Sequence, residues 1–133
     1  MKFKFLEHKA DVKFQAFGNS LEECFKNATL AFTSVMIDYK KIKPKIHKKI
    51  SVKGTDLKNL LYNFLEELII LIDAENFISS KVKFLKIKKL TLKAELIGDE
   101  ISNYEVHNHI KAVTYNEMKI KEKPYMIQVV LDI

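Results

Sequence analysis

The chain is organised around the stretch Phe5-Leu6-Glu7-His8-Lys9-Ala10-Asp11. This stretch places ionisable side chains between two short segments of alternating polarity, where a hydrophobic core does not need them. Its counterpart is the tail Val129-Val130-Leu131-Asp132-Ile133, an apolar run that ends in one carboxylate side chain and the terminal carboxylate. We expect folding to bring these two ends together.

The first half of the sequence predicts strands on either side of two long helices. Ser20-Leu21-Glu22-Glu23 is a capping box, and the apolar residues that follow it are spaced for one face of a helix, with Asn27 and Thr33 facing away. Thr55 or Asp56 caps a second helix with a wide apolar stripe. Alternating segments predict strands over residues 2–6, 12–17 and 45–52.

The second half predicts only strands, over residues 77–87, 90–97, 110–120 and 125–133, and the last two should form a hairpin. Clustered strands with only two long helices indicate the α+β class. We therefore expect one domain over residues 1–133, in which a mainly antiparallel sheet packs against the two amphipathic helices.

Composition limits the classes of function. The lone Cys24 falls on the apolar stripe of the first helix, which suits a core residue in a reducing cytoplasm. No apolar run is long enough to cross a membrane. The formal net charge of +6 favours an acidic partner or RNA, with lysines crowded at 40–53 and 81–93. Without arginine or an aromatic platform motif, we expect RNA contact to be indirect or weak, and a solvated lysine-rich surface is the alternative.

Strand direction predicts an acidic cluster at one edge of the sheet. A turn near Glu122 places Lys111 opposite Ile133, within two positions, and antiparallel strands bring Asp11 beside Asp132. Three carboxylates about 5 Å apart would repel by roughly 3 kcal/mol per pair. Hard oxygen ligands would then favour Ca²⁺, Mg²⁺ or Mn²⁺. The alternative is that Asp11 caps a loop and Asp132 is a surface residue.

The histidines give weaker signals. His8 could act as a ligand or base, although a single histidine beside a turn is commonly a hydrogen-bonded structural residue. His47, His107 and His109 are assigned no role. The sequence contains no glycine-rich phosphate loop and no nucleophile framework. A metal-dependent hydrolase or nucleotidyltransferase that works alone is a further alternative.

Taken together, five segments resemble the archease family, small proteins that assist the RtcB-type tRNA-splicing RNA ligase. They span nearly the whole chain in the family's order. The segments are Phe5-Leu6-Glu7-His8-Lys9-Ala10-Asp11-Val12, Gly18-Asn19-Ser20-Leu21-Glu22-Glu23-Cys24-Phe25, Asp56 to Leu68, Lys111-Ala112-Val113-Thr114-Tyr115, and Leu131-Asp132-Ile133.

The resemblance implies an accessory protein without a reaction of its own, which promotes guanylylation of the ligase from GTP and its multiple turnover. It implies a metal site, most commonly calcium, at Asp11, Asp132 and the Ile133 carboxylate, with Lys111 as a functional lysine. Glu7 and His8 also match the family, and we expect them to help activate the partner. A general chaperone or protein-interaction module is the rival expectation.

The sequence departs from the family pattern at two positions. Lys9 stands where the family usually has threonine, and Asn116 stands where it usually has histidine after Tyr115. Lys9 adds positive charge two residues from Asp11, which should weaken cation binding or replace part of it.

Overall fold

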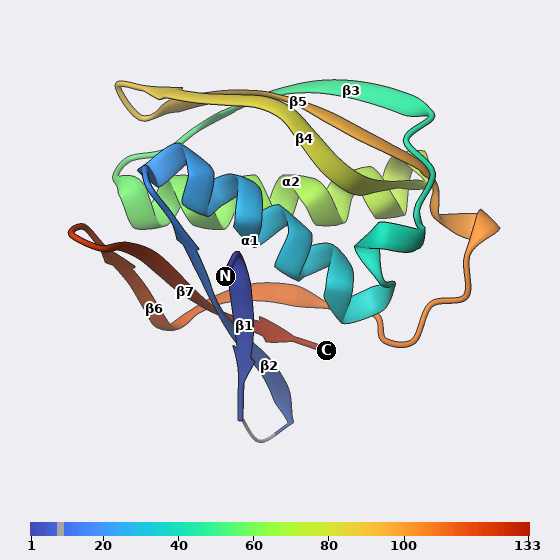
Figure 1. The fold of residues 1–133 in the computed structure, drawn as a ribbon, viewed down its shortest axis with the longest axis horizontal. Coiled ribbons are helices and arrows are strands. Elements are labelled where there is room, and N and C mark those ends of the chain that lie inside the picture. The colour runs from blue at the N-terminus through green and yellow to red at the C-terminus, as the bar shows by residue number, and fades with distance from the viewer. Residues whose placement is uncertain (8–9) are drawn as a thin grey trace.

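A computed structural model describes residues 1–7 and 10–133; His8 and Lys9 lie outside the described residues. Two antiparallel sheets enclose two helices (Figure 1). The larger sheet has the strand order β1-β2-β7-β6 and the smaller has the order β3-β5-β4. The strands are β1 (Phe3–Leu6), β2 (Asp11–Gly18), β3 (Ile46–Lys53), β4 (Phe77–Lys88), β5 (Thr91–Glu100), β6 (Ala112–Lys121) and β7 (Tyr125–Asp132).

The helices α1 (Leu21–Met36) and α2 (Leu57–Glu75) form the middle layer, and each contacts both sheets. Short 3-10 turns follow α1 at Tyr39–Lys41 and β5 at Ile101–Asn103. The predicted α+β class, the antiparallel pairing and the two helices are confirmed. The strands divide into two sheets, a separation that alternation along the sequence does not reveal.

Both helices begin at the predicted residues. The Ser20 hydroxyl accepts a hydrogen bond from the Glu23 amide at 3.1 Å, and the Glu23 carboxylate accepts from the Asn19 amide at 3.0 Å, one residue before the cap. Asp56, not Thr55, caps α2, because its carboxylate accepts from the Asn59 amide at 2.8 Å. These bonds satisfy amides that have no partner inside the helix.

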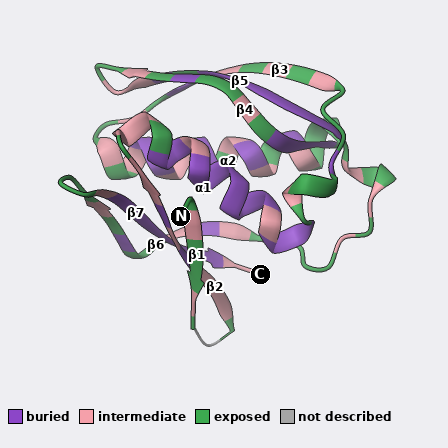
Figure 2. Ribbon diagram, in the orientation of Figure 1, coloured by how far each residue is buried: buried purple, intermediate pink, exposed green. Residues whose placement is uncertain are grey.

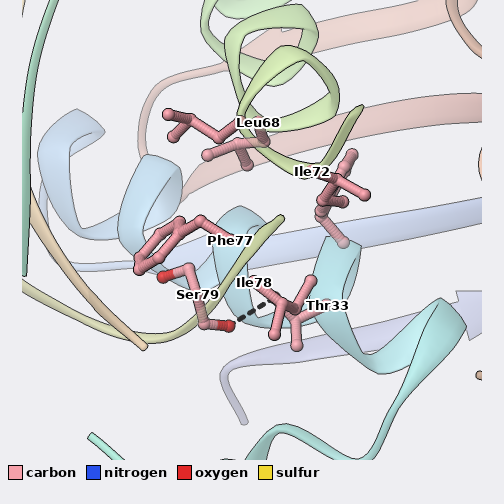
Figure 3. A pocket seen from close by; sticks show the side chains of 8 residues that line it. Thr33, Leu68, Ile72, Phe77, Ile78 and Ser79 are labelled. Carbon is pink, nitrogen blue, oxygen red and sulfur yellow. Dashed lines mark hydrogen bonds between the residues drawn. The ribbon is translucent and has the colours of Figure 1, made fainter. Parts of the chain in front are cut away.

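The second sheet explains why one prediction about α1 is wrong. Asn27 and Thr33 are buried instead of facing solvent, because α1 has a sheet on each side. The Asn27 side-chain amide donates to the Phe17 carbonyl of β2 at 2.6 Å. The Thr33 hydroxyl donates to the Ser79 carbonyl of β4 at 2.7 Å (Figure 3). One helix is therefore tied to both sheets by buried polar side chains.

The core fills the space between the sheets, as the buried segments of both helices show in Figure 2. A cavity of about 10 Å³ remains between α1, α2 and β4, close to the size needed for a single water. It is too small for a cofactor. Its lining residues, most of them labelled in Figure 3, are Phe32, Thr33, Leu68, Leu71, Ile72, Phe77, Ile78 and Ser79.

Candidate functional site

The two ends of the chain meet in the larger sheet. Strands β2 and β7 are antiparallel, and their register pairs Asp11 with Asp132. The pairing continues without interruption to Gly18 and Tyr125, so the position of the two acids is set by a full ladder of backbone hydrogen bonds. The predicted meeting of the two ends is confirmed.

The neighbouring strand brings the predicted lysine to the same edge. Strand β6 pairs Ala112 with Asp132, and the Lys111 amide donates to the Asp132 carbonyl at 2.7 Å. Lys111 is exposed and lies beside the last residue of the chain, as the hairpin register predicted. Asp132 is therefore held between β2 on one side and β6 on the other.

The acidic edge, defined as Asp11, Asp132 and the Ile133 carboxylate, has the chemistry of a site for a hard cation. Directly paired residues of antiparallel strands point to the same face, with Cβ atoms about 4.5–5.5 Å apart. Both aspartates are partly exposed. The Ile133 side chain packs against the core, which anchors the end of the chain. Carboxylate oxygens with room for water suit Ca²⁺, which takes six to eight oxygen ligands.

The acidic edge offers few side chains that could coordinate a metal ion. Among the residues described by the structure, no group of three or more His, Cys, Asp or Glu side chains is placed to hold a metal. The acidic edge contributes two aspartates and one main-chain carboxylate, and His8 lies outside the described residues. Metal binding by Asp11, Asp132 and Ile133 therefore stays a prediction.

The backbone is constrained at Ala10, directly before the acidic edge. Glu7 is exposed just beyond β1. Ala10 has φ of 60°, in the left-handed region, which costs an alanine about 1–2 kcal/mol. Such residues are concentrated at functional sites. Glu7 therefore lies between the end of β1 and the start of β2, as the sequence predicted, and its role stays a prediction.

A polar network on the larger sheet was not predicted from the sequence. The Lys13 ammonium lies 3.0 Å from the Glu117 carboxylate, and the Gln15 amide donates to the Gln128 side-chain oxygen at 2.8 Å. Gln128 also donates to the Glu117 carbonyl at 2.7 Å. This network fixes the bulge of β6, where pairing with β7 is interrupted between Thr114 and Lys119. The signal in the sequence that could have revealed this network is Gln128, a polar residue inside an otherwise apolar run.

Tyr115 is a second feature that the sequence did not assign. It lies in the same bulge and is 50% exposed, yet its ring stacks on Tyr62 of α2 with centroids 4.4 Å apart and planes 10° apart. The Asn59 side-chain amide donates to the Tyr115 hydroxyl at 2.8 Å. These contacts join α2 to the strand that carries Lys111.

The remaining candidate groups are one cysteine and three histidines. Cys24 is fully buried, and burial raises its pKa to about 11, which confirms the prediction of a core residue. His47 Nδ1 lies 2.8 Å from the Glu95 carboxylate, and this hydrogen bond is the main cause that lowers the pKa of Glu95. His107 and His109 are exposed.

Over residues 1–7 and 10–133, neither helix combines the length and the apolar character needed to cross a bilayer.

Comparison with known proteins extends over nearly the whole chain. The model of the archease protein family matches residues 3–133. Archease from Sulfurisphaera tokodaii is 39% identical over 138 residues, and the match covers 99% of each chain. Archease from Pyrococcus abyssi is 36% identical over 140 residues, again with 99% of each chain covered.

Solved structures agree in fold. The solution structure of a Methanobacterium thermoautotrophicum protein superposes with a TM-score of 0.83 at 31% identity, covering 99% of each chain. The crystal structure of an archease from Thermotoga maritima, called a possible chaperone, has a TM-score of 0.63 at 18% identity, which shows the shared fold alone. It covers 98% of this chain and 96% of that one. Together with the family match and the full-length sequence relatives, this places the chain in the archease family.

Proposed function

We propose that this protein is an accessory activator of an RtcB-type tRNA-splicing RNA ligase, which promotes guanylylation of the ligase from GTP and its multiple turnover. Membership in the archease family supports the proposal. The observation that carries it is the direct pairing of Asp11 with Asp132 beside Lys111.

In this proposal the acidic edge holds one divalent cation, with Ca²⁺ preferred and Mg²⁺ or Mn²⁺ possible. The cation would supply positive charge toward the phosphates of the nucleotide in the ligase. Asp132 is rigidly placed because backbone pairing holds it from both sides. Lys111 is exposed at the same edge and adds a second positive group that can reach a partner.

Activation is tested by counting turnovers of the cognate ligase with and without this protein. We expect Asp11→Ala and Asp132→Ala to leave only the single turnover of ligase already guanylylated. The matched control is Asp73→Ala, which removes an exposed carboxylate near the end of α2. Absence of any gain with the wild-type protein, or a full gain with both acidic-edge variants, would contradict the proposal.

The contributions of Lys111 and of the terminal carboxylate can be separated. Lys111→Ala should lower activation while calcium binding persists, whereas Lys119→Ala, which removes an exposed lysine of the strand that follows Lys111, should change neither. Addition of two glycines after Ile133 moves the terminal carboxylate and removes no side chain. We expect this extension to weaken calcium binding, and unchanged binding would exclude the terminal carboxylate as a ligand.

The rival function is that of a general chaperone or protein-interaction module, and the name given to the T. maritima protein favours considering it. A chaperone that acts through its surface does not need the acidic edge. Protection of unrelated aggregating proteins by the Asp11→Ala variant, together with no effect on the ligase, would favour this rival.

A further inference from the structure

The smaller sheet exposes a broad positively charged surface, which we call the basic face. It is the side of β3, β5 and β4 directed away from the helices (Figure 1); Figure 2 shows exposed residues along β3 and β4, whereas most of the central strand β5 is buried. Register and contacts place thirteen residues on it: His47, Lys49, Ser51, Lys53, Lys81, Lys83, Phe84, Lys86, Lys88, Thr91, Lys93, Glu95 and Ile97.

The basic face carries the whole net charge of the protein. It has seven lysines and one carboxylate, that of Glu95, and the formal net charge of the chain is +6. The rest of the chain is balanced, with sixteen lysines and sixteen acidic side chains. Positive charge is therefore concentrated on one surface, where it creates a strong field toward a polyanion.

Stability of the sheet does not account for this arrangement. Lys86 and Lys93 are direct cross-strand partners, and the other neighbour of Lys93 is Ser51. Like charges directly opposite each other destabilise an antiparallel pair. An acidic residue at position 86 or 93 would relieve the repulsion, so the lysines are retained at a cost to the fold.

The basic face also offers an apolar surface of the kind that a nucleobase needs. Phe84 is 42% exposed and lies directly opposite Glu95. Near the end of the β4–β5 hairpin, a shallow hollow is lined by Lys86, Lys88, Thr91 and Lys93, whose lysine stems are apolar.

Glu95 is the acidic residue of the basic face, and its carboxylate contacts two basic side chains. Its carboxylate lies 2.8 Å from His47 Nδ1 and 3.7 Å from the Lys83 ammonium, and the residue is only 7% exposed. At the far end of β5, the Asp99 carboxylate is also buried, where it accepts a hydrogen bond from the Tyr104 hydroxyl at 2.7 Å. Lysines therefore dominate the charge that reaches solvent.

We propose that the basic face binds single-stranded RNA directly and without sequence preference, in contrast to the indirect or weak contact expected from the sequence. Lysine is a point charge that contacts phosphate but does not form the planar fork that reads guanine, and the chain has no arginine. Alternate residues of a strand lie about 6.7 Å apart, a spacing that lets successive lysines follow the phosphates of an extended strand. Phe84 supplies a stacking surface for an unpaired base.

The proposal goes beyond ligase activation and does not depend on it, because the acidic edge belongs to the other sheet. Duplex RNA fits less well, since paired bases cannot stack on Phe84. An anionic membrane fits less well because a single exposed phenylalanine gives little surface to insert.

The test measures fluorescence anisotropy of a labelled, unstructured RNA of about 16 nucleotides with the full-length protein and no ligase. We expect binding whose logarithm falls linearly with the logarithm of salt concentration. Five phosphate contacts would give a slope of about −3.5. A hairpin RNA, polyglutamate and phosphatidylserine vesicles serve as competing ligands and should bind at least several-fold more weakly.

Two variants separate charge from stacking. Lys86→Glu with Lys93→Glu should lower affinity on the order of tenfold or more and flatten the salt slope by about 1.4. The matched control, Lys119→Glu with Lys121→Glu, changes the net charge from +6 to +2 in the same way on the larger sheet, and should retain most of the affinity. Phe84→Ala should lower affinity about tenfold with the slope unchanged, whereas Phe5→Ala, which removes a 45% exposed ring from β1, should not.

Three results would overturn the proposal. They are no binding at low salt, equal binding of polyglutamate or vesicles, and equal losses from the two charge-reversal pairs. Because Lys86→Glu with Lys93→Glu keeps a like-charged pair, the fold should be little affected, and thermal unfolding of each variant verifies that it is folded.

Discussion

The two sheets of this protein present charge in opposite ways. On the larger sheet, Asp11 and Asp132 converge at one edge because a single register pairs them. On the smaller sheet, seven lysines are distributed over an entire face. A concentrated pair of acids suits a single small cation, whereas a spread of lysines suits an extended polyanion. The helix layer separates the two surfaces, so each can be altered without the other (Figure 1).

Calcium binding should give the largest difference between the two sheets, measured as the free energy of unfolding. At a calcium concentration one hundred times the dissociation constant, binding to the native state alone raises the free energy of unfolding by about 2.7 kcal/mol. We expect this gain in the wild-type protein and its loss in Asp132→Asn, measured by chemical denaturation with calcium and with a chelator. Lys86→Glu with Lys93→Glu should keep the full gain. Equal stabilisation of wild type and Asp132→Asn would place the cation elsewhere.

The buried hydrogen bonds that connect α1 to the two sheets allow a test of how independent the sheets are. Thr33→Val keeps the shape of the side chain and leaves the Ser79 carbonyl of β4 without its donor, which should cost about 1–2 kcal/mol. Denaturation in urea measures this loss. Because the change lies at β4, calcium binding at the acidic edge should be unaffected. A matching loss of calcium affinity would mean that the two sheets are coupled through α1.

The sequence predicted that Asp11 and Asp132 meet if their strands run antiparallel, and the structure confirms that pairing, whereas the metal site stays a prediction. Alternation located β2 and β7, and an antiparallel pair that starts at Asp11 must end near Asp132. The helix caps were predictable for a different reason, since Ser20 and Asp56 act over only three residues.

The basic face and the burial of Asn27 and Thr33 depend on tertiary arrangement that alternation does not specify. Two clusters of lysines were visible, but their union on one face required the pairing of β3, β5 and β4 as a separate sheet. A helix that packs on one sheet and a helix that lies between two sheets can have the same apolar stripe. The sequence does not distinguish them when short polar residues, such as Asn27 and Thr33, contribute to the contacts with the sheets. The Lys13–Glu117 contact joins residues 104 positions apart, which no local pattern predicts.

A charge reversal on the basic face should raise stability slightly. Lys93→Glu converts the repulsive pair with Lys86 into an attractive one, and we expect a gain of about 0.5 kcal/mol at low salt that disappears at high salt. Thermal unfolding at two ionic strengths measures it. Lys121→Glu, whose cross-strand partner is Met126, is the matched control and should show no such gain. A loss of stability in Lys93→Glu would mean that the lysine makes a structural contribution.

The smallest expected effect concerns the one acid of the basic face. The hydrogen bond from His47, followed by the nearby lysines, holds the pKa of Glu95 below its usual value of about 4.3. Because the folded pKa is the lower one, the stabilisation is complete above pH 4.3 and is lost as the pH falls through the folded pKa. The difference in unfolding temperature between wild type and Glu95→Gln should therefore shrink as the pH falls from about 5 toward 3. In a His47→Asn background the same comparison should depend less on pH, since the main cause of the lowered pKa is gone. A difference that does not change below pH 4.3 would mean that Glu95 contributes through packing and not through its charge.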